Sequence, residues 1–371
     1  MTSIFNHNGA LLMGYMVFLN CIAILCVAPQ FSRNSKHGIG LFALAILTFL
    51  MSLLPIQSGD FIYYGQILQT GRNFSHFEDF YQLLWLFNPD YIEWRAVVWG
   101  ACVLLLIINI KLLHLNGKFA AFIFIITQFF YFGTMRNMFG FMLMFVSVTI
   151  FYISISSVKK YPLIIIAALG LWGSTFLHRS MWMYVLFLIV GIIPINKYLI
   201  KISLIAFPFA WTSVFVLSSW FLSTFADTEM QTHADAYTSG ERVSTILQTT
   251  MELIKNGAYL YLLYIVTSHY CRPKCNFPNV IKFLIRYSYF LFYVGFLFLG
   301  QTSGGWLYSR FTEAGQITFM FVMMYFFYNY PRTRNVKIAF GVLIVFILYR
   351  ILYITMRAPE EFIARINTIT I

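Results

Sequence analysis

Two neighbouring apolar stretches with basic residues at their ends constrain this chain more than any other feature. They cover residues 138–157 and 161–177, and a lysine pair separates them. Arg136 precedes the first stretch, and His178 follows the second. A charged side chain costs about 2.5–3.5 kcal/mol at the centre of a membrane helix, so charges gather where spans end. The pattern therefore predicts two antiparallel membrane helices that place Arg136 and His178 on the same side.

The same pattern of apolar runs and short basic loops extends along the whole chain. Of the 371 residues, 60% are hydrophobic and 10% are charged, whereas a soluble domain is about 25% charged. We therefore expect one all-α polytopic membrane domain over residues 1–371. The first apolar run lacks the basic start of a signal peptide, and we expect it to be an uncleaved span. Twelve runs are candidate spans: residues 9–28, 39–56, 96–113, 119–133, 138–157, 161–177, 181–195, 202–224, 256–270, 287–300, 315–329 and 338–356.

The charges indicate an orientation for these spans. If the loop 30–38 lies inside, then fifteen of the 25 basic residues lie inside and all 13 acidic residues lie outside. This asymmetry follows the positive-inside rule and predicts that both termini lie outside. The outer basic residues are arginines except Lys255. Arginines on one face suit a planar anion such as phosphate, although arginine also tolerates the interface by extending its charge into water.

The larger loops all lie on the predicted outer side. They cover residues 57–95 and 226–255, and a shorter loop covers residues 301–315. Helical spacing of apolar residues in the first loop predicts interfacial helices. Its aromatic residues, which include Tyr64 and Trp85, suit either an interfacial belt or stacking on sugars. No inner loop could fold a nucleotide-binding domain, and no segment has metal-ligand spacing, so neither a nucleotide nor a metal ion is expected.

An outward-facing site of this kind restricts the available chemistry. No ATP is present there, so a transferred group must arrive already activated and already across the membrane. Lipid-linked pyrophosphates meet that condition, because the lipid lies between helices and the pyrophosphate meets arginines at headgroup depth. His178 or Asp60 could remove a hydroxyl proton, although a histidine at the end of a span also suits the interface without any catalytic role.

The order of these residues resembles a known family. Asp60 with a following tyrosine, Arg136 at the start of a span, His178-x-Ser180 after the next hairpin, and Tyr308-x-Arg310 before a late span are similar to the EpsG and Wzy-type polymerases of bacterial exopolysaccharide and O-antigen. The resemblance covers most of the chain. One departure is that Asn137 and two large apolar residues follow Arg136, where members of the family commonly have small residues.

The resemblance implies a multi-spanning glycosyltransferase of the bacterial inner membrane that uses no metal ion and no cofactor. It would join undecaprenyl-pyrophosphate-linked oligosaccharide repeat units on the periplasmic side, within the lipid bilayer and without nucleic acid. A chain-length regulator and a flippase are implied partners. The implied roles are pyrophosphate binding by Arg136, Arg310 and Arg179, proton removal by His178 or Asp60, and sugar binding by Tyr64, Trp85 and Trp306.

Two other functions fit parts of the pattern. A transporter or flippase of lipid-linked oligosaccharides could line its path with arginines, but ion-coupled transporters usually keep ionisable groups near the membrane centre. None of the 13 acidic residues lies within the centre of a predicted span. An O-antigen ligase would need the same outward arginines and base as a polymerase, and only the family resemblance favours the polymerase.

Overall fold

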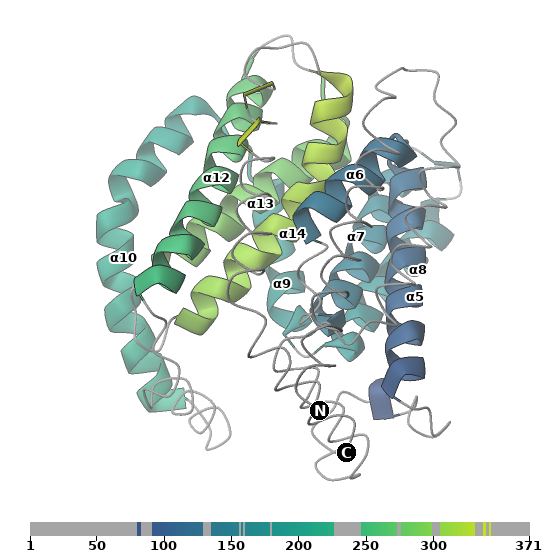
Figure 1. The fold of residues 1–371 in the computed structure, drawn as a ribbon, viewed down its shortest axis with the longest axis horizontal. Helices are drawn as coiled ribbons and strands as arrows, with labels where there is room; N and C mark the ends of the chain where they lie inside the picture. Colours follow the sequence, from purple (N-terminus) through teal and green to yellow (C-terminus); the bar gives the residue numbers. More distant parts are fainter. Residues whose placement is uncertain are drawn as a thin grey trace, which may run out of the picture. The chain divides into compact units, whose positions relative to one another are not determined.

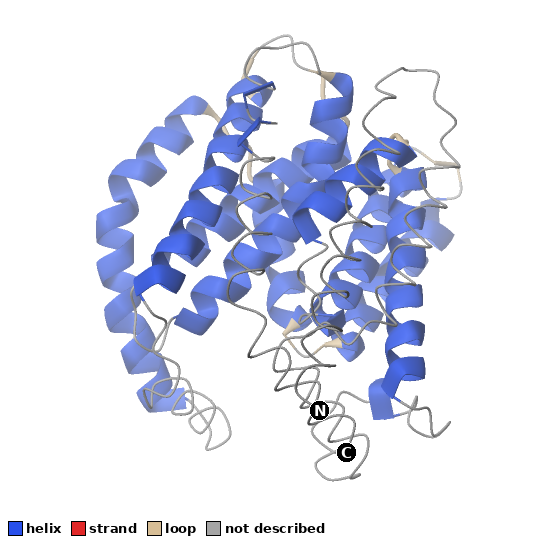
Figure 2. Ribbon diagram, viewed as in Figure 1, coloured by secondary structure: helices blue, strands red, loops and turns tan. Residues whose placement is uncertain are grey.

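The described part of the chain is helical throughout. The computed structural model describes residues 80–82, 91–128, 135–155, 157–158, 160–178, 180–225, 246–272, 276–298, 305–330, 337–338 and 341–342. These residues form helices and short turns, and no strand occurs among them (Figure 2). The predicted all-α class is therefore confirmed for this part. Three of its helices are long and apolar enough to cross a membrane: Arg136–Ile155, Lys160–Leu177 and Asn279–Leu297.

The chain divides into two compact units. One consists of Met1–Leu186, Met323–Pro331 and Leu343–Ile371, and the other of Phe187–Val322 and Arg332–Val342. The described helices of the first unit are α5 (Tyr91–Leu112), α6 (Gly117–Gln128), α7 (Met135–Ile155), α8 (Lys160–Leu177) and the main part of α9 (Met181–Phe187) (Figure 1). Those of the second are η4 (Leu188–Ile192), α10 (Lys197–Phe225), α12 (Ile246–Tyr270), α13 (Asn279–Leu297) and most of α14 (Gly305–Asn329).

A seam of small residues holds α7 and α8 together. A Cβ atom added at Gly170 would overlap the Ser147 hydroxyl, and Ala167 and Ser174 are buried on the same side of α8. Small residues allow helix backbones to approach closely inside a membrane, where apolar burial alone does not favour association. The other side of α8 exposes large apolar residues, as expected for contact with lipid: Tyr161, Ile165, Ile166, Leu169, Trp172 and Phe176.

Buried polar contacts attach α7 to α5. The Asn109 side-chain nitrogen donates to the Met142 carbonyl over 3.1 Å, and the Thr149 hydroxyl donates to the Asn109 side-chain oxygen over 3.4 Å. All three residues are buried. Because each polar group finds a protein partner, the apolar core can contain an amide without leaving it unsatisfied.

Helix α13 lies at the centre of the second unit, in contact with η4, α10 and α12. A Cβ atom at Gly191 in η4 would overlap the Phe283 ring, so the two segments are in close contact. The Ser203 hydroxyl on α10 shares a hydrogen bond with the Tyr289 hydroxyl on α13. On the α12 side, the rings of Tyr259 and Phe292 stack with centroids 6.2 Å apart.

Five helices begin at least five residues earlier than the hydropathy pattern predicts. α5 begins at Tyr91 instead of residue 96, and α12 begins at Ile246 instead of 256. α10 begins at Lys197 instead of 202, α13 at Asn279 instead of 287, and α14 at Gly305 instead of 315. Each early turn carries polar or basic residues that lower local hydropathy but still allow a helix to form. Residues 246–255 and 305–315, predicted as outer loops, are accordingly helical. The predicted spans 9–28 and 39–56, and most of 338–356, lie outside the described residues.

Candidate functional site

Arg136 lies in the first turn of α7, where the sequence predicts the start of a span. Its side chain is half-buried, and its guanidinium carbon lies 5.8 Å from the centroid of the Tyr81 ring. This distance is within the range of a cation–π interaction. Tyr81 is itself fully buried, and the neighbouring Phe80 ring contacts the Phe139 ring edge-on at 5.6 Å. The helical turn at residues 80–82 therefore packs its aromatic side chains against the first turn of α7, and Tyr81 contacts Arg136.

The turn that contains His178 lies at the same end of the hairpin. α8 ends at Leu177, and the His178 carbonyl accepts a hydrogen bond of 2.9 Å from the Met181 amide, which begins α9. The Ser180 hydroxyl donates to the side-chain oxygen of Asn137 over 3.2 Å. Since Asn137 follows Arg136 directly, this contact brings the His178 turn to the start of α7. The antiparallel pair predicted from the sequence is present in the structure.

Gly140 allows this close approach. A Cβ atom at Gly140 would lie 2.7 Å from Cγ and 3.0 Å from the sulfur of Met181, so a larger residue would require the Met181 side chain to move. The two large residues between Asn137 and this glycine are buried in the core, as Met138 and Phe139. The close contact between α7 and α9 therefore falls at Gly140, and Asn137 serves as a hydrogen-bond acceptor for Ser180.

This arrangement suits an anion with a proton-transfer group nearby. The first turn of a helix leaves backbone N–H groups free to donate, and its dipole favours negative charge. Arg136 adds a fixed positive charge there. His178, half-buried, lies on the adjoining turn. An imidazole is the side chain best suited to accept a proton near neutral pH.

Arg310 belongs to the second unit and lies on α14, where it is half-buried. Buried hydrogen bonds fix the turn before it. The Asn256 side-chain nitrogen donates to the Tyr308 hydroxyl over 2.6 Å, and the Gln316 side-chain nitrogen donates to the Asn256 side-chain oxygen over 2.8 Å. The tyrosine of the Tyr308-x-Arg310 motif thus attaches α14 to α12. Glu313 follows Arg310 by three residues on the same helix.

The remaining predicted site residues are not all described. Asp60, Tyr64, Trp85 and Arg179 lie outside the described residues, and so do most of the loop 57–95 and residues 226–245. Trp306 lies in the first turn of α14, and its side chain is likewise outside the described part. Of the predicted residues, the structure brings together the turns that contain Arg136 and His178.

Ser180 belongs to a motif identified from the sequence, but its contact with Asn137 and the contact of Tyr81 with Arg136 were not predicted. Tyr81 and Ser180 contact the start of α7 from distant parts of the chain, and no spacing in the sequence relates them to it. For the turn before Arg310, a signal was available in Asn256 at the start of a predicted span, because an amide buried within a membrane helix bundle requires a partner. One of its partners is the hydroxyl group of Tyr308.

Among the residues that the structure describes, no group of three or more histidine, cysteine, aspartate or glutamate side chains could hold a metal ion. Comparison with known proteins adds no relative. The chain matches no protein-family model, no curated protein and no solved structure.

Proposed function

We propose that this protein is a membrane glycosyltransferase that polymerises polysaccharide repeat units on the outer face of the bacterial inner membrane. Its donor would be a growing glycan on undecaprenyl pyrophosphate, and its acceptor a new lipid-linked repeat unit. The observation that carries the proposal is the contact between the start of α7 and the His178 turn. It supports the presence of an anion-binding arginine and a proton acceptor at one end of a hairpin.

In this reaction the acceptor hydroxyl oxygen attacks the anomeric carbon of the donor sugar. His178, or Asp60 in its place, takes the hydroxyl proton as the new glycosidic bond forms. The bond between the anomeric carbon and the pyrophosphate oxygen breaks, and the lipid pyrophosphate leaves with the electron pair. Arg136 stabilises the developing negative charge, with Arg310 and Arg179 as further ligands of the pyrophosphate. Tyr64, Trp85 and Trp306 would bind the sugars of the two chains.

The test is deletion of the gene in its host, followed by analysis of the surface glycan and the lipid-linked intermediates. A polymerase leaves single repeat units on the surface, or stranded on the carrier at the outer leaflet. Repeat units trapped on the inner leaflet would overturn the proposal in favour of a flippase. Full-length polymer retained on the carrier would overturn it in favour of a ligase. Expression of the intact gene from a plasmid must restore the original glycan.

A further inference from the structure

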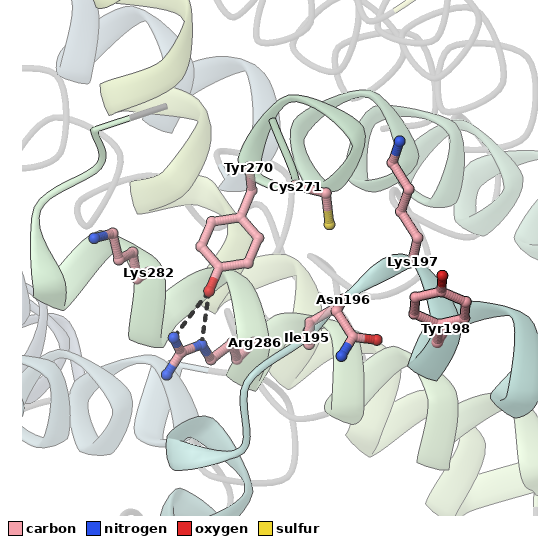
Figure 3. Close-up of a pocket in the computed structure, with 8 residues that line it drawn as sticks. All are labelled: Ile195, Asn196, Lys197, Tyr198, Tyr270, Cys271, Lys282 and Arg286. Carbon is pink, nitrogen blue, oxygen red and sulfur yellow. Dashed lines mark hydrogen bonds between the residues drawn. The ribbon is translucent and has the colours of Figure 1, made fainter. Parts of the chain in front are cut away.

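A basic hollow lies within the second unit, where the ends of α10, α12 and α13 meet (Figure 3). It is an open cavity of about 460 Å³, a size typical of sites for small molecules. None of its lining residues is acidic, and three of them are basic. The lining consists of Ile195, Asn196, Lys197, Tyr198, Tyr270, Cys271, Lys282 and Arg286.

Hydrogen bonds fix the position of Arg286 in this hollow. Its Nε and one terminal nitrogen donate to the Tyr270 hydroxyl over 3.1 and 2.8 Å, and its other terminal nitrogen donates to the Ile192 carbonyl over 3.2 Å. Figure 3 shows Tyr270 and Arg286 facing each other on one side, with Lys197 on the other side. These contacts use three of the five N–H donors of the guanidinium group. The two that remain belong to a preorganised, charged group, which is the preferred partner of a phosphate.

An apolar stripe begins at this hollow and follows α10. It starts at Tyr198, a lining residue that is 77% exposed, and continues through Ile202, Ile205 and Phe209, which are 61, 73 and 74% exposed. Their spacing places all four on one face of the helix. Ser203 lies on the opposite face, where it bonds to Tyr289 of α13. The stripe is therefore turned away from the rest of the unit.

The described part of the stripe is long enough to contact an acyl chain across one leaflet of a bilayer. From Tyr198 to Phe209 the helix rises about 16 Å, and half of the hydrocarbon thickness is about 15 Å. A ligand that combines one phosphate with one long acyl chain would therefore meet complementary groups along its whole length. The charge asymmetry of the sequence places Lys197, Lys282 and Arg286 on the inner side, where anionic phospholipids are attracted to basic residues.

We propose that this hollow and stripe form a binding site for an anionic phospholipid of the inner leaflet. The phosphate lies among Lys197, Lys282 and Arg286, and one acyl chain lies along the exposed face of α10. This site is separate from the proposed glycosyl transfer. It gives the protein a specific lipid ligand whose binding can be measured without any knowledge of the polymer.

The experiment uses purified, delipidated full-length protein in detergent, titrated with phosphatidylglycerol or with phosphatidylcholine of the same acyl chains. Native mass spectrometry counts the bound lipid. One basic residue near the membrane contributes about 1 kcal/mol to the binding of anionic lipid, which is about fivefold in affinity. We therefore expect Lys282→Ala to weaken phosphatidylglycerol binding about fivefold. Lys201→Ala, which removes an exposed lysine of α10 outside the lining, is the matched control and should weaken binding less than Lys282→Ala does.

Two further measurements separate the lipid from other sources of phosphate. Ile205→Asn interrupts the stripe without touching the hollow, so it should weaken phosphatidylglycerol binding while leaving the three cations in place. Inorganic phosphate in millimolar excess should fail to displace the lipid. Equal binding of the two lipids, equal losses in Lys282→Ala and Lys201→Ala, or full displacement by inorganic phosphate would each overturn the proposal. Circular dichroism of every variant must show the helix content of the unaltered protein.

Discussion

The Ser180 hydroxyl donates a hydrogen bond of 3.2 Å to the side-chain oxygen of Asn137, although 43 residues separate the two in the chain. This contact joins the turn after α8 to the first turn of α7. It fixes the position of His178 on one side and Arg136 on the other, since each is close in sequence to one of the bonded residues. The candidate site therefore depends on two polar residues that have no role of their own in the proposed chemistry.

Removal of either partner of this hydrogen bond should lower the stability of the protein, and the two effects should not be additive. We expect Asn137→Ala and Ser180→Ala each to lower the free energy of unfolding by about 1 kcal/mol, and the double variant to lose less than the sum. The difference is the coupling energy, which averages about 0.6 kcal/mol for such bonds within membranes. Equilibrium unfolding in mixed micelles measures all four proteins of the cycle. Strict additivity would show that the two residues do not interact.

Arg136→Ala should abolish polymer while normal amounts of protein remain in the membrane. Removal of one group that stabilises developing charge typically costs 10²–10³-fold in rate. Arg136→Lys keeps the charge without the planar fork, so it should retain a small part of the activity. Gel analysis of the surface glycan, with immunoblots of membranes, checks both. The control is Arg272→Ala, which removes an exposed arginine after α12. Normal polymer length from Arg136→Ala would exclude this residue from the site.

His178→Ala should reduce turnover more than it reduces binding of the lipid-linked substrate. A positioned general base contributes about 10²–10⁴-fold to the rate, whereas a proton acceptor contributes little to the affinity of the ground state. Turnover and binding are measured separately, on purified protein with synthetic lipid-linked repeat units. A larger loss of binding than of turnover would make His178 a binding residue, and Asp60 would then be the remaining candidate base.

Gly191→Ala should destabilise the second unit. The added Cβ would overlap the Phe283 ring, and overpacking of this kind costs about 1–3 kcal/mol. Gly257→Ala is the matched control, because a Cβ there meets nothing within 4 Å and alanine favours the helix by about 0.5–1 kcal/mol. Thermal unfolding in detergent should therefore show opposite shifts of the midpoint. Equal midpoints for the two variants would contradict the close contact between η4 and α13.

The thiol of Cys271 should react slowly with maleimide at neutral pH. Burial raises the pKa of this thiol, and the nearby positive charge of Lys197 lowers it by a smaller amount. Because the thiolate is the reactive form, a raised pKa moves the rise in labelling rate to higher pH. Lys197→Met removes the positive charge that lowers the pKa of Cys271, so the labelling rate should rise at a still higher pH. The measurement uses protein whose other four cysteines are alanine, with Lys201→Met as control. A downward shift in Lys197→Met would contradict this assignment.

Hydropathy and charge predict the helices well where a span is uniformly apolar. α7 and α8 begin and end within three residues of the predicted limits, because basic residues mark both of their ends. The prediction fails at α13, whose first turns alternate buried residues such as Ile281 and Phe283 with Lys282, which lines the hollow. The hydropathy averaged over such a mixture is as low as that of a loop, so these turns were not predicted as part of a span. The prediction fails at α14 for a related reason, since Thr312 is polar but buried, with its hydroxyl donating to the Tyr308 carbonyl.

The candidate site could be predicted only in part. Charge placement alone puts Arg136 and His178 at one end of a hairpin, because two spans of similar length must return the chain to the same side. The groups that hold them require tertiary structure. Tyr81 packs beneath Arg136 from another segment, and Ser180 reaches Asn137 only after α8 has folded back along α7. These residues are far apart in the sequence, so the spacing of residues along a helix cannot predict that they meet.

The amide of Asn109 has a consequence for motion. It bonds to the backbone of α7 at Met142 and to the hydroxyl of Thr149, two turns further along the same helix. A slide of α5 by one turn, about 5.4 Å, would break both bonds in a region where no water can replace them. The two helices are therefore locked in one register. A catalytic cycle that needs this part of the protein to move must carry α5 and α7 together as a single rigid piece.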